Sequence, residues 1–258
     1  MDKIIEQQRK HFDEISKRYF DARQNENHLF YKELMWRNFF KKIDKYFNKK
    51  KYNCLEAMCG YAEGFKIIKN FSNINIDYKG FDYSEELVQI ANENSPELNI
   101  INGNILTYKD ENNYDLIILL GGLHHVYKNV DKALENINKL IERDSFFINL
   151  EPTHNNLFFK KIREKIYKSN DLFDDESEQA FELIELNNLF IKNGYEKVEQ
   201  IYPGLLGYIL YYNPDAFQNL NIGNKTMVKF IFMIEKYFFN NFIGRYFSFA
   251  TLSLWRKK

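Results

Sequence analysis

Two adjacent histidines, His124 and His125, directly follow the apolar run 114–120, at the point where a buried strand would end. The pKa of an imidazole lies near neutrality, so a histidine placed there can accept the proton of an attacking hydroxyl. In an extended backbone the two side chains point in opposite directions. We expect His125 to face the substrate, because His124 follows Leu123 toward the packed side. A purely structural role is an equally good interpretation for each histidine taken singly, and we predict a site role for at least one of them.

Two more candidates close the next apolar run, 146–150, namely Glu151 and His154. Either could be the base, or could contact the acceptor, in place of the histidine pair. A metal site built from His124, Glu151 and His154 is conceivable. Its spacing matches no known ligand pattern, so we predict no metal ion.

The stretch 55–64 is an apolar strand that ends in Glu56, followed by a small-residue turn and the start of a helix. This arrangement presents a ligand site at the first strand of a dinucleotide-type α/β domain. A dinucleotide fingerprint would place glycines at Met58 and Glu63 as well as at Gly60, and only Gly60 is present. The carboxylate of Glu56 would also repel a pyrophosphate in a low-dielectric pocket. An NAD-linked oxidoreductase is therefore disfavoured, and a ligand with an ammonium and a sulfonium suits the site better.

With Cys59-Gly60 at its centre, this stretch resembles the glycine-turn motif of class I S-adenosylmethionine (SAM) dependent methyltransferases. The segment 103–106 is similar to that family's G-D-x-x-x-L segment, with Asn104 in place of the acid. Residues 11–19 look like its N-terminal F-D-x-x-x-x-x-Y helix, which closes over the cofactor. The resemblance covers residues 12–202 well and the tail only by pattern. It is closest in type to bacterial enzymes that methylate metabolites, including sugar hydroxyls.

The resemblance implies that SAM is the cofactor and S-adenosylhomocysteine (SAH) the product. Glu56 would orient the methionine ammonium, directly or through water. Asp82, at the end of the second strand, would accept hydrogen bonds from both ribose hydroxyls. The helix N-terminus after the turn favours the methionine carboxylate. The remaining residues that we expect around the cofactor are Tyr19, Ala57, Gly60, Tyr83, Asn104, Ile105, Leu120 and Gly121.

From residue 53 onward the hydrophobic pattern alternates between strand and helix, which predicts parallel strands joined by right-handed crossovers. We expect an α/β fold: a doubly wound, mostly parallel, seven-stranded Rossmann-like sheet. The resemblance implies that the terminal alternating segment 247–256 is an antiparallel strand beside the sixth strand. Ser84 is placed to cap the helix that follows the second strand. The turn 142–145 should lead from a helix into the fifth strand, and a helix should begin at Gln179.

We predict one methyltransferase domain over residues 1–258. Within it, residues 1–50 would form a helical lid, 51–151 the SAM-binding core, and 152–258 two substrate-side insertions with the C-terminal strands. The acidic stretch 171–178 is expected to be a loop in the first insertion.

Composition limits the partners. The 258 residues contain 36 basic and 36 acidic side chains, so binding to bulk nucleic acid through phosphate neutralisation is not expected. The two cysteines favour a reduced, cytoplasmic protein. The N-terminus is too charged for a signal peptide, and no run approaches the roughly 20 apolar residues of a membrane span.

The acceptor is the least determined part. After the fourth strand the chain has 120–123, Leu-Gly-Gly-Leu, instead of an Asn/Asp-Pro-Pro-aromatic tetrapeptide, which argues against methylation of an exocyclic base amine. We expect a small molecule, with O-methylation of a sugar or sugar-nucleotide hydroxyl first. An amino sugar or small amine comes second, and a lipid or quinone third because of the aromatic helix near 226–239. A non-catalytic SAM-binding protein stays open as an alternative.

Overall fold

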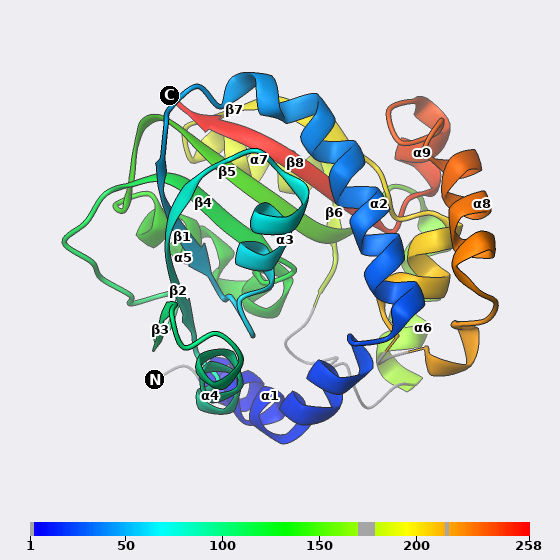
Figure 1. Cartoon of the computed structure of the whole chain (residues 1–258), viewed down its shortest axis with the longest axis horizontal. Helices are drawn as coiled ribbons and strands as arrows, with labels where there is room; N and C mark the ends of the chain where they lie inside the picture. Colours follow the sequence, from blue (N-terminus) through cyan, green and yellow to red (C-terminus); the bar gives the residue numbers. More distant parts are fainter. Residues whose placement is uncertain (1–2, 170–178, 215–216) are drawn as a thin grey trace.

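A computed structural model describes residues 3–169, 179–214 and 217–258 of the chain. Its centre is a sheet in the order β3-β2-β1-β4-β5-β8-β7, with the short β6 paired to β5 (Figure 1). Neighbouring strands from β3 to β5 are parallel, and β8 is antiparallel to both β5 and β7. The predicted doubly wound sheet, with its inserted C-terminal strand, is thus confirmed. The strands are β1 (Tyr52–Ala57), β2 (Ile76–Asp82), β3 (Asn99–Asn102), β4 (Tyr114–Leu120), β5 (Ile141–His154), β6 (Phe181–Glu182), β7 (Tyr195–Ile201) and β8 (Ala250–Lys257).

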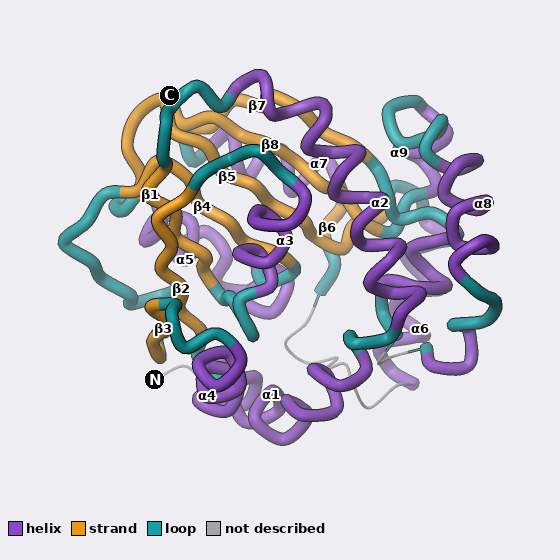
Figure 2. Tube along the Cα trace, viewed as in Figure 1, coloured by secondary structure: helices purple, strands orange, loops and turns teal. Residues whose placement is uncertain are grey.

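Helices cover both faces of the sheet (Figure 2). The α-helices are α1 (Lys3–Ala22), α2 (Glu26–Ile43), α3 (Glu63–Phe71), α4 (Glu85–Asn94), α5 (Val130–Ile137), α6 (Leu157–Ser169), α7 (Leu183–Lys192), α8 (Lys225–Glu235) and α9 (Phe242–Phe247). The shorter turns are 3₁₀ helices η1 (Asp44–Tyr46), η2 (Leu123–Asn129) and η4 (Gln218–Leu220), and the π-helical turn η3 (Tyr208–Tyr212). One core packs beneath α2, α3 and α8, and a second lies beneath α5 and α7.

The N-terminal helices differ in how deeply they are built into the protein. The side chain of Asn25 caps α2 by accepting from the backbone N–H groups of Asn27 and His28, and one apolar face of α2 is then buried in the core. Those buried side chains are Tyr31, Met35, Trp36, Phe39, Phe40 and Ile43. Helix α1 instead lies across the end of the sheet beside α4 (Figure 1). A mobile lid would therefore consist of α1 alone.

Three expected boundaries are wrong. Residues 142–145 are part of β5, because Asp144 adopts φ +64° and lets the strand bulge rather than turn. Residues 181–182 form β6 against β5, so the next helix begins at Leu183 and not at Gln179. The C-terminal strand begins at Ala250, since residues 242–247 form α9. The predicted acidic loop 171–178 lies outside the described residues.

Candidate active site

The turn after β1 is held by the carboxylate of Glu56, which is 1% exposed. Its two oxygens accept hydrogen bonds from the backbone N–H groups of Gly64 (2.7 Å) and Phe65 (3.1 Å) and from the Tyr78 hydroxyl (2.6 Å). A Cβ at Gly64 would lie 2.8 Å from this carboxylate, so glycine is needed for the approach. Burial raises the pKa of Glu56 to about 7, while the hydroxyl and the two N–H donors act in the opposite direction. Glu56 therefore caps α3 and fixes the turn.

The same turn forms a backbone cradle. Met58, Gly60 and Ala62 adopt φ of +53°, +53° and +61°, a region that glycine favours. The turn therefore has left-handed backbone conformations at all three positions, although Met58 and Ala62 carry side chains. A Cβ on Gly60 would meet no atom within 4 Å, and one on Gly121, after β4, would meet only His124 Cε1 at 3.8 Å. Open space therefore borders the ends of β1 and β4, where the strand order reverses and α/β sheets bind ligands.

Asp82 ends β2 beside this space. Its carboxylate accepts from the backbone N–H of Gly60 (2.8 Å) and of Ser84 (3.0 Å), and burial raises its pKa. Ser84 caps α4 by accepting from Leu87 N–H, as predicted. The other residues expected around the cofactor follow the ends of the same strands: Ala57 on β1, Tyr83 after β2, Asn104 and Ile105 after β3, and Leu120 and Gly121 at the end of β4.

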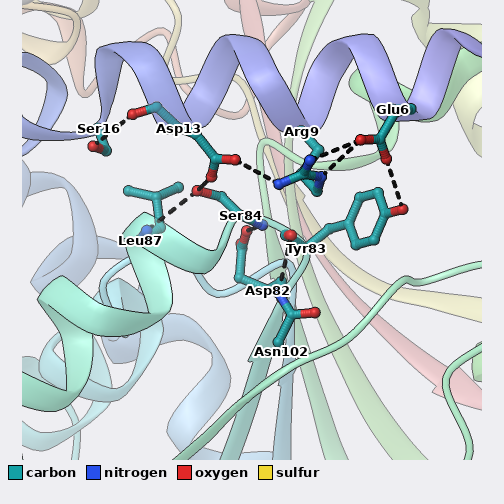
Figure 3. A network of polar contacts seen from close by, with 9 residues as sticks. All are labelled: Glu6, Arg9, Asp13, Ser16, Asp82, Tyr83, Ser84, Leu87 and Asn102. Carbon is teal, nitrogen blue, oxygen red and sulfur yellow. Dashed lines mark hydrogen bonds and ion pairs between the residues drawn. The ribbon is translucent and has the colours of Figure 1, made fainter.

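Helix α1 is tied to this loop by a polar network (Figure 3). Asp13 accepts from the Ser84 hydroxyl (2.6 Å), and Glu6 accepts from the Tyr83 hydroxyl (3.2 Å). Arg9 lies between Glu6 and Asp13 and donates to both. These contacts were not foreseen from the sequence, because only the fold brings Asp13 to Ser84.

The two candidate histidines lie in η2, so the expectation of opposite directions in an extended backbone is wrong: their ring centroids are 3.9 Å apart. His124 Nδ1 lies 2.9 Å from Glu151 Oε2. Glu151 is fully buried and also accepts from the backbone N–H of Gly122 (3.2 Å), Leu123 (2.9 Å) and His124 (3.3 Å). Burial raises the pKa of Glu151 to about 7, and the N–H donors act against that rise. His124 is therefore fixed by a carboxylate, as a general base requires.

The remaining candidates are placed differently. The His125 ring contacts Phe12 of α1 edge to face at 4.9 Å, and Tyr19 of α1 lies under the Arg23 guanidinium at 4.1 Å. His154 lines a separate pocket of about 540 Å³ between the end of β5, α6 and α9, and no other residue that we predicted lines it. Among the described residues, no three His, Cys, Asp or Glu side chains are grouped as metal ligands.

Comparison with known proteins decides the family. Residues 48–201 match a family model described as "Methyltransferase domain". The chain belongs to this methyltransferase family. A segment of 74 residues is 42% identical to malonyl-[acyl-carrier protein] O-methyltransferase 1 of Ilyobacter polytropus, and the match covers 27% of this chain and 27% of that relative.

Two solved structures share the fold of this methyltransferase. A SAM-dependent methyltransferase of Thermotoga maritima, described as a possible histamine N-methyltransferase, aligns with TM-score 0.60 at 13% identity, over 96% of this chain and 98% of that one. An O-methyltransferase from a trans-AT PKS multienzyme of Brevibacillus brevis, in complex with SAH, aligns with TM-score 0.55 at 15% identity, over 87% and 71%. The protein therefore has the methyltransferase domain of this family on a Rossmann-like sheet, the fold that it shares with a SAM-dependent enzyme and with an O-methyltransferase that binds SAH.

Sequence reasoning missed how the two strand-end acids are used. Glu151 was considered as a base, whereas the structure shows it holding His124 and capping η2. Tyr78, which binds Glu56, was not considered at all. A signal for Glu151 was present, since both Glu56 and Glu151 end an apolar strand.

Proposed function

We propose that this methyltransferase transfers the methyl group of SAM to a hydroxyl of a small molecule, with His124 as the general base. The observation that carries the proposal is the 2.9 Å contact between His124 Nδ1 and the buried Glu151 carboxylate, at the strand ends that border the open space. With Nδ1–H donated to Glu151, the His124 lone pair is on Nε2 and can accept the acceptor's hydroxyl proton. Glu151 then stabilises the imidazolium that forms.

The cradle supports SAM as a fit for the site. When bound, SAM supplies a methyl group already activated on a cationic sulfur, so the protein's task is alignment and exclusion of water. We assign Asp82 to the ribose hydroxyls and the backbone at Ala57, Gly60 and Gly121 to the methionine part. For the adenine and the surrounding wall we assign Tyr19, Tyr83, Asn104, Ile105 and Leu120. Both Glu56 oxygens are engaged by α3 and Tyr78, so we assign Glu56 to holding the turn.

The acceptor that we propose is a sugar or sugar-nucleotide hydroxyl. A hydroxyl is a poor nucleophile near neutrality and needs a base, whereas a carboxylate is already ionised. The oriented His124 therefore favours a hydroxyl over a carboxylate such as that of a malonyl thioester. We further propose that α1 acts as a lid, because it contacts the residues around the open space. Glu6 and Asp13 bind the loop after β2, and Phe12, Tyr19 and Phe20 make ring contacts with His125 and with Tyr61 of the β1 turn.

Mass spectrometry of reactions with SAM tests the proposal directly. The acceptor panel would contain sugars, sugar nucleotides, amino sugars, small amines and a malonyl thioester. We expect a methyl ether product whose formation depends on His124, and calorimetry should show SAH binding that Asp82→Asn weakens. A methyl ester or a methylated amine formed equally well by His124→Asn would reject the hydroxyl proposal. Exchange of α1 amides that SAH leaves unchanged would reject the lid.

A further inference from the structure

Aromatic side chains gather on one outer face of the protein. In the described part of the chain, every strongly exposed Phe or Tyr belongs to α6, α8 or α9 or, in the case of Tyr237, to the turn directly after α8. These residues are Phe158, Phe230, Tyr237, Phe242, Tyr246 and Phe247. We call this set the aromatic face. Soluble proteins rarely expose a contiguous apolar patch of this kind unless something binds it.

Helix α8 packs on the core through the side opposite the aromatic face, so its exposed aromatic side chains do not contribute to that packing. Its inner side buries Val228 and Phe232 against the core beneath α2. Its outer side carries Phe230, Met233 and Ile234, which are 65%, 47% and 50% exposed, and Tyr237 follows in the turn after the helix, 72% exposed. Two apolar stripes on opposite sides of one helix exceed what packing on one core requires.

The three helices form one continuous surface. Asn156 Nδ2, directly before α6, donates to the Tyr246 carbonyl of α9 at 2.8 Å, and Asn155 donates to the Arg245 carbonyl. Gly244 of α9 packs so closely on the Phe238 carbonyl after α8 that a Cβ could not fit there. Figure 1 shows α6, α8 and α9 together on the side of the molecule away from β3.

The part of this face that α8 and α9 contribute is basic, whereas α6 carries one exposed acid, Glu164, among its lysines. Residues 217–249 contain four basic residues and a single acid, Glu235. Glu235 is buried, where it accepts from the Tyr31 hydroxyl and Gly207 N–H. Among the described residues Lys225 pairs with Glu26 and Lys160 with Glu182. Within the part of the chain that the structure describes, Lys161, Lys165, Lys229, Lys236 and Arg245 have no carboxylate partner.

We propose that the aromatic face binds the surface of a membrane that contains anionic lipids. Exposed aromatic rings interleaved with unpaired Lys and Arg have the chemistry of an interfacial membrane site, with rings in the headgroup region and cations on lipid phosphates. Within the described residues no helix is long and apolar enough to cross a membrane, which leaves binding in the plane of the surface. A second copy of the chain is disfavoured, because a two-fold contact would place these cations against one another. This inference goes beyond methyl transfer.

Vesicle co-sedimentation of the full chain tests the apolar part. Vesicles of phosphatidylcholine alone are compared with a two-to-one mixture of phosphatidylcholine and phosphatidylglycerol. The wild type should bind the anionic vesicles and bind them less at high salt. The triple variant Phe230→Ser/Tyr237→Ser/Phe242→Ser should lose at least tenfold in partitioning. The matched control, Ile101→Ser/Ile191→Ser, removes exposed apolar side chains elsewhere and should bind like the wild type.

Charge reversal tests the electrostatic part. Lys229→Glu/Arg245→Glu should weaken binding by about fivefold or more per residue, whereas Lys41→Glu/Lys50→Glu on another surface should have little effect. SAH affinity, measured on the same samples, should be unchanged in all variants, which separates this proposal from that of the acceptor. A wild type that ignores anionic vesicles would overturn the inference. Light scattering that shows a dimeric wild type and a monomeric triple Ser variant would also overturn it, since the aromatic face would then bind a second copy of the chain.

Discussion

Glu56 and Glu151 lie in the C-terminal part of two strands, β1 and β5, that flank β4, and the carboxylate of each caps the start of a helix. Each is at most 1% exposed, each accepts hydrogen bonds from backbone N–H groups at the start of a helix, and burial raises the pKa of each to about 7. Capping a helix N-terminus with a buried acid is thus used twice in one sheet.

The two glutamates differ in the functional group that binds them from a neighbouring side chain: a phenol at Glu56 and an imidazole at Glu151. Glu56 binds the Tyr78 hydroxyl, a group with no proton-accepting role at neutral pH, because burial raises the pKa of Tyr78 well above its usual value. Glu151 binds an imidazole. The same capping carboxylate therefore closes the β1 turn as structure, and at β5 it orients a base. Each prediction below would break or sharpen that distinction.

The largest effect is expected for His124→Asn. The amide can still donate to Glu151 but cannot take a proton, so turnover should fall by about a hundredfold or more. SAH affinity should stay close to that of the wild type, because His124 does not hold the cofactor in our proposal. Steady-state kinetics and calorimetry measure the two quantities, with His125→Asn as the neighbouring control. Full turnover in His124→Asn would make the Glu151–His124 pair structural and return the base role to His125 or His154.

Glu151→Gln and Glu56→Gln form the direct comparison. Glu151→Gln should lower turnover at saturating SAM by about tenfold or more, because the neutral amide no longer stabilises the imidazolium. Wild-type turnover should rise with pH through about 7, as Glu151 ionises, and the variant should lose this dependence. Glu56→Gln should change turnover by less than about threefold, with its loss mainly in stability. Equal losses of turnover in both variants would remove the distinction between the two acids.

The fold was readable because its signals are local. The mostly apolar run 114–120 predicted a buried strand, and Ser84 predicted the start of α4; both were confirmed. The error at 142–145 arose because Asp, like Asn, tolerates a left-handed conformation, so Asp144 can stand in a bulge as well as in a turn.

The sequence predicted where the acidic residues of the site lie along the chain, but not which groups they bind. The sequence placed Glu56, Asp82 and Glu151 at strand ends. The structure confirms this for Asp82 and, within one residue, for Glu56, whereas β5 continues past Glu151 to His154. Which group each carboxylate binds depends on register: β1 pairs with β2 so that Cys54 is opposite Tyr78, and only this brings the hydroxyl to Glu56. The relative directions of the two histidine side chains were predicted wrongly, because both residues lie in a 3₁₀ helix, where the alternation of an extended chain does not hold.

Gly64→Ala tests how tightly Glu56 is held. The added Cβ would lie 2.8 Å from the Glu56 carboxyl and from Ile118 Cγ2, so the variant should lose up to about 3 kcal/mol in the free energy of unfolding. Chemical denaturation measures the loss. Asn70→Ala, at an exposed position of the same helix, is the control and should stay within about 0.5 kcal/mol. A Gly64→Ala protein as stable as the wild type would show that Glu56 can leave α3, and would reopen its role as a cofactor ligand.

The smallest effect, and the one with a characteristic pH dependence, is expected for Tyr78→Phe. The variant loses the hydroxyl that donates to Glu56, at a cost of about 1–2 kcal/mol. The folded pKa of Glu56, about 7, is above its ordinary value of 4.5, so the contribution of Glu56 to stability is full below about pH 4.5 and is lost as pH rises through 7. The Tyr78 hydroxyl lowers that pKa, and without it the pKa rises further and the loss of stability continues to higher pH. The difference in unfolding free energy between wild type and Tyr78→Phe should therefore widen from about pH 5 to about pH 8.

Tyr202→Phe is the control. Its lost hydrogen bond is to the neutral amide of Gln200, so its difference in unfolding free energy from the wild type should not change with pH. A constant difference in both variants would show that Glu56 does not titrate near 7, and that the two strand-end acids differ in ionisation as well as in partner.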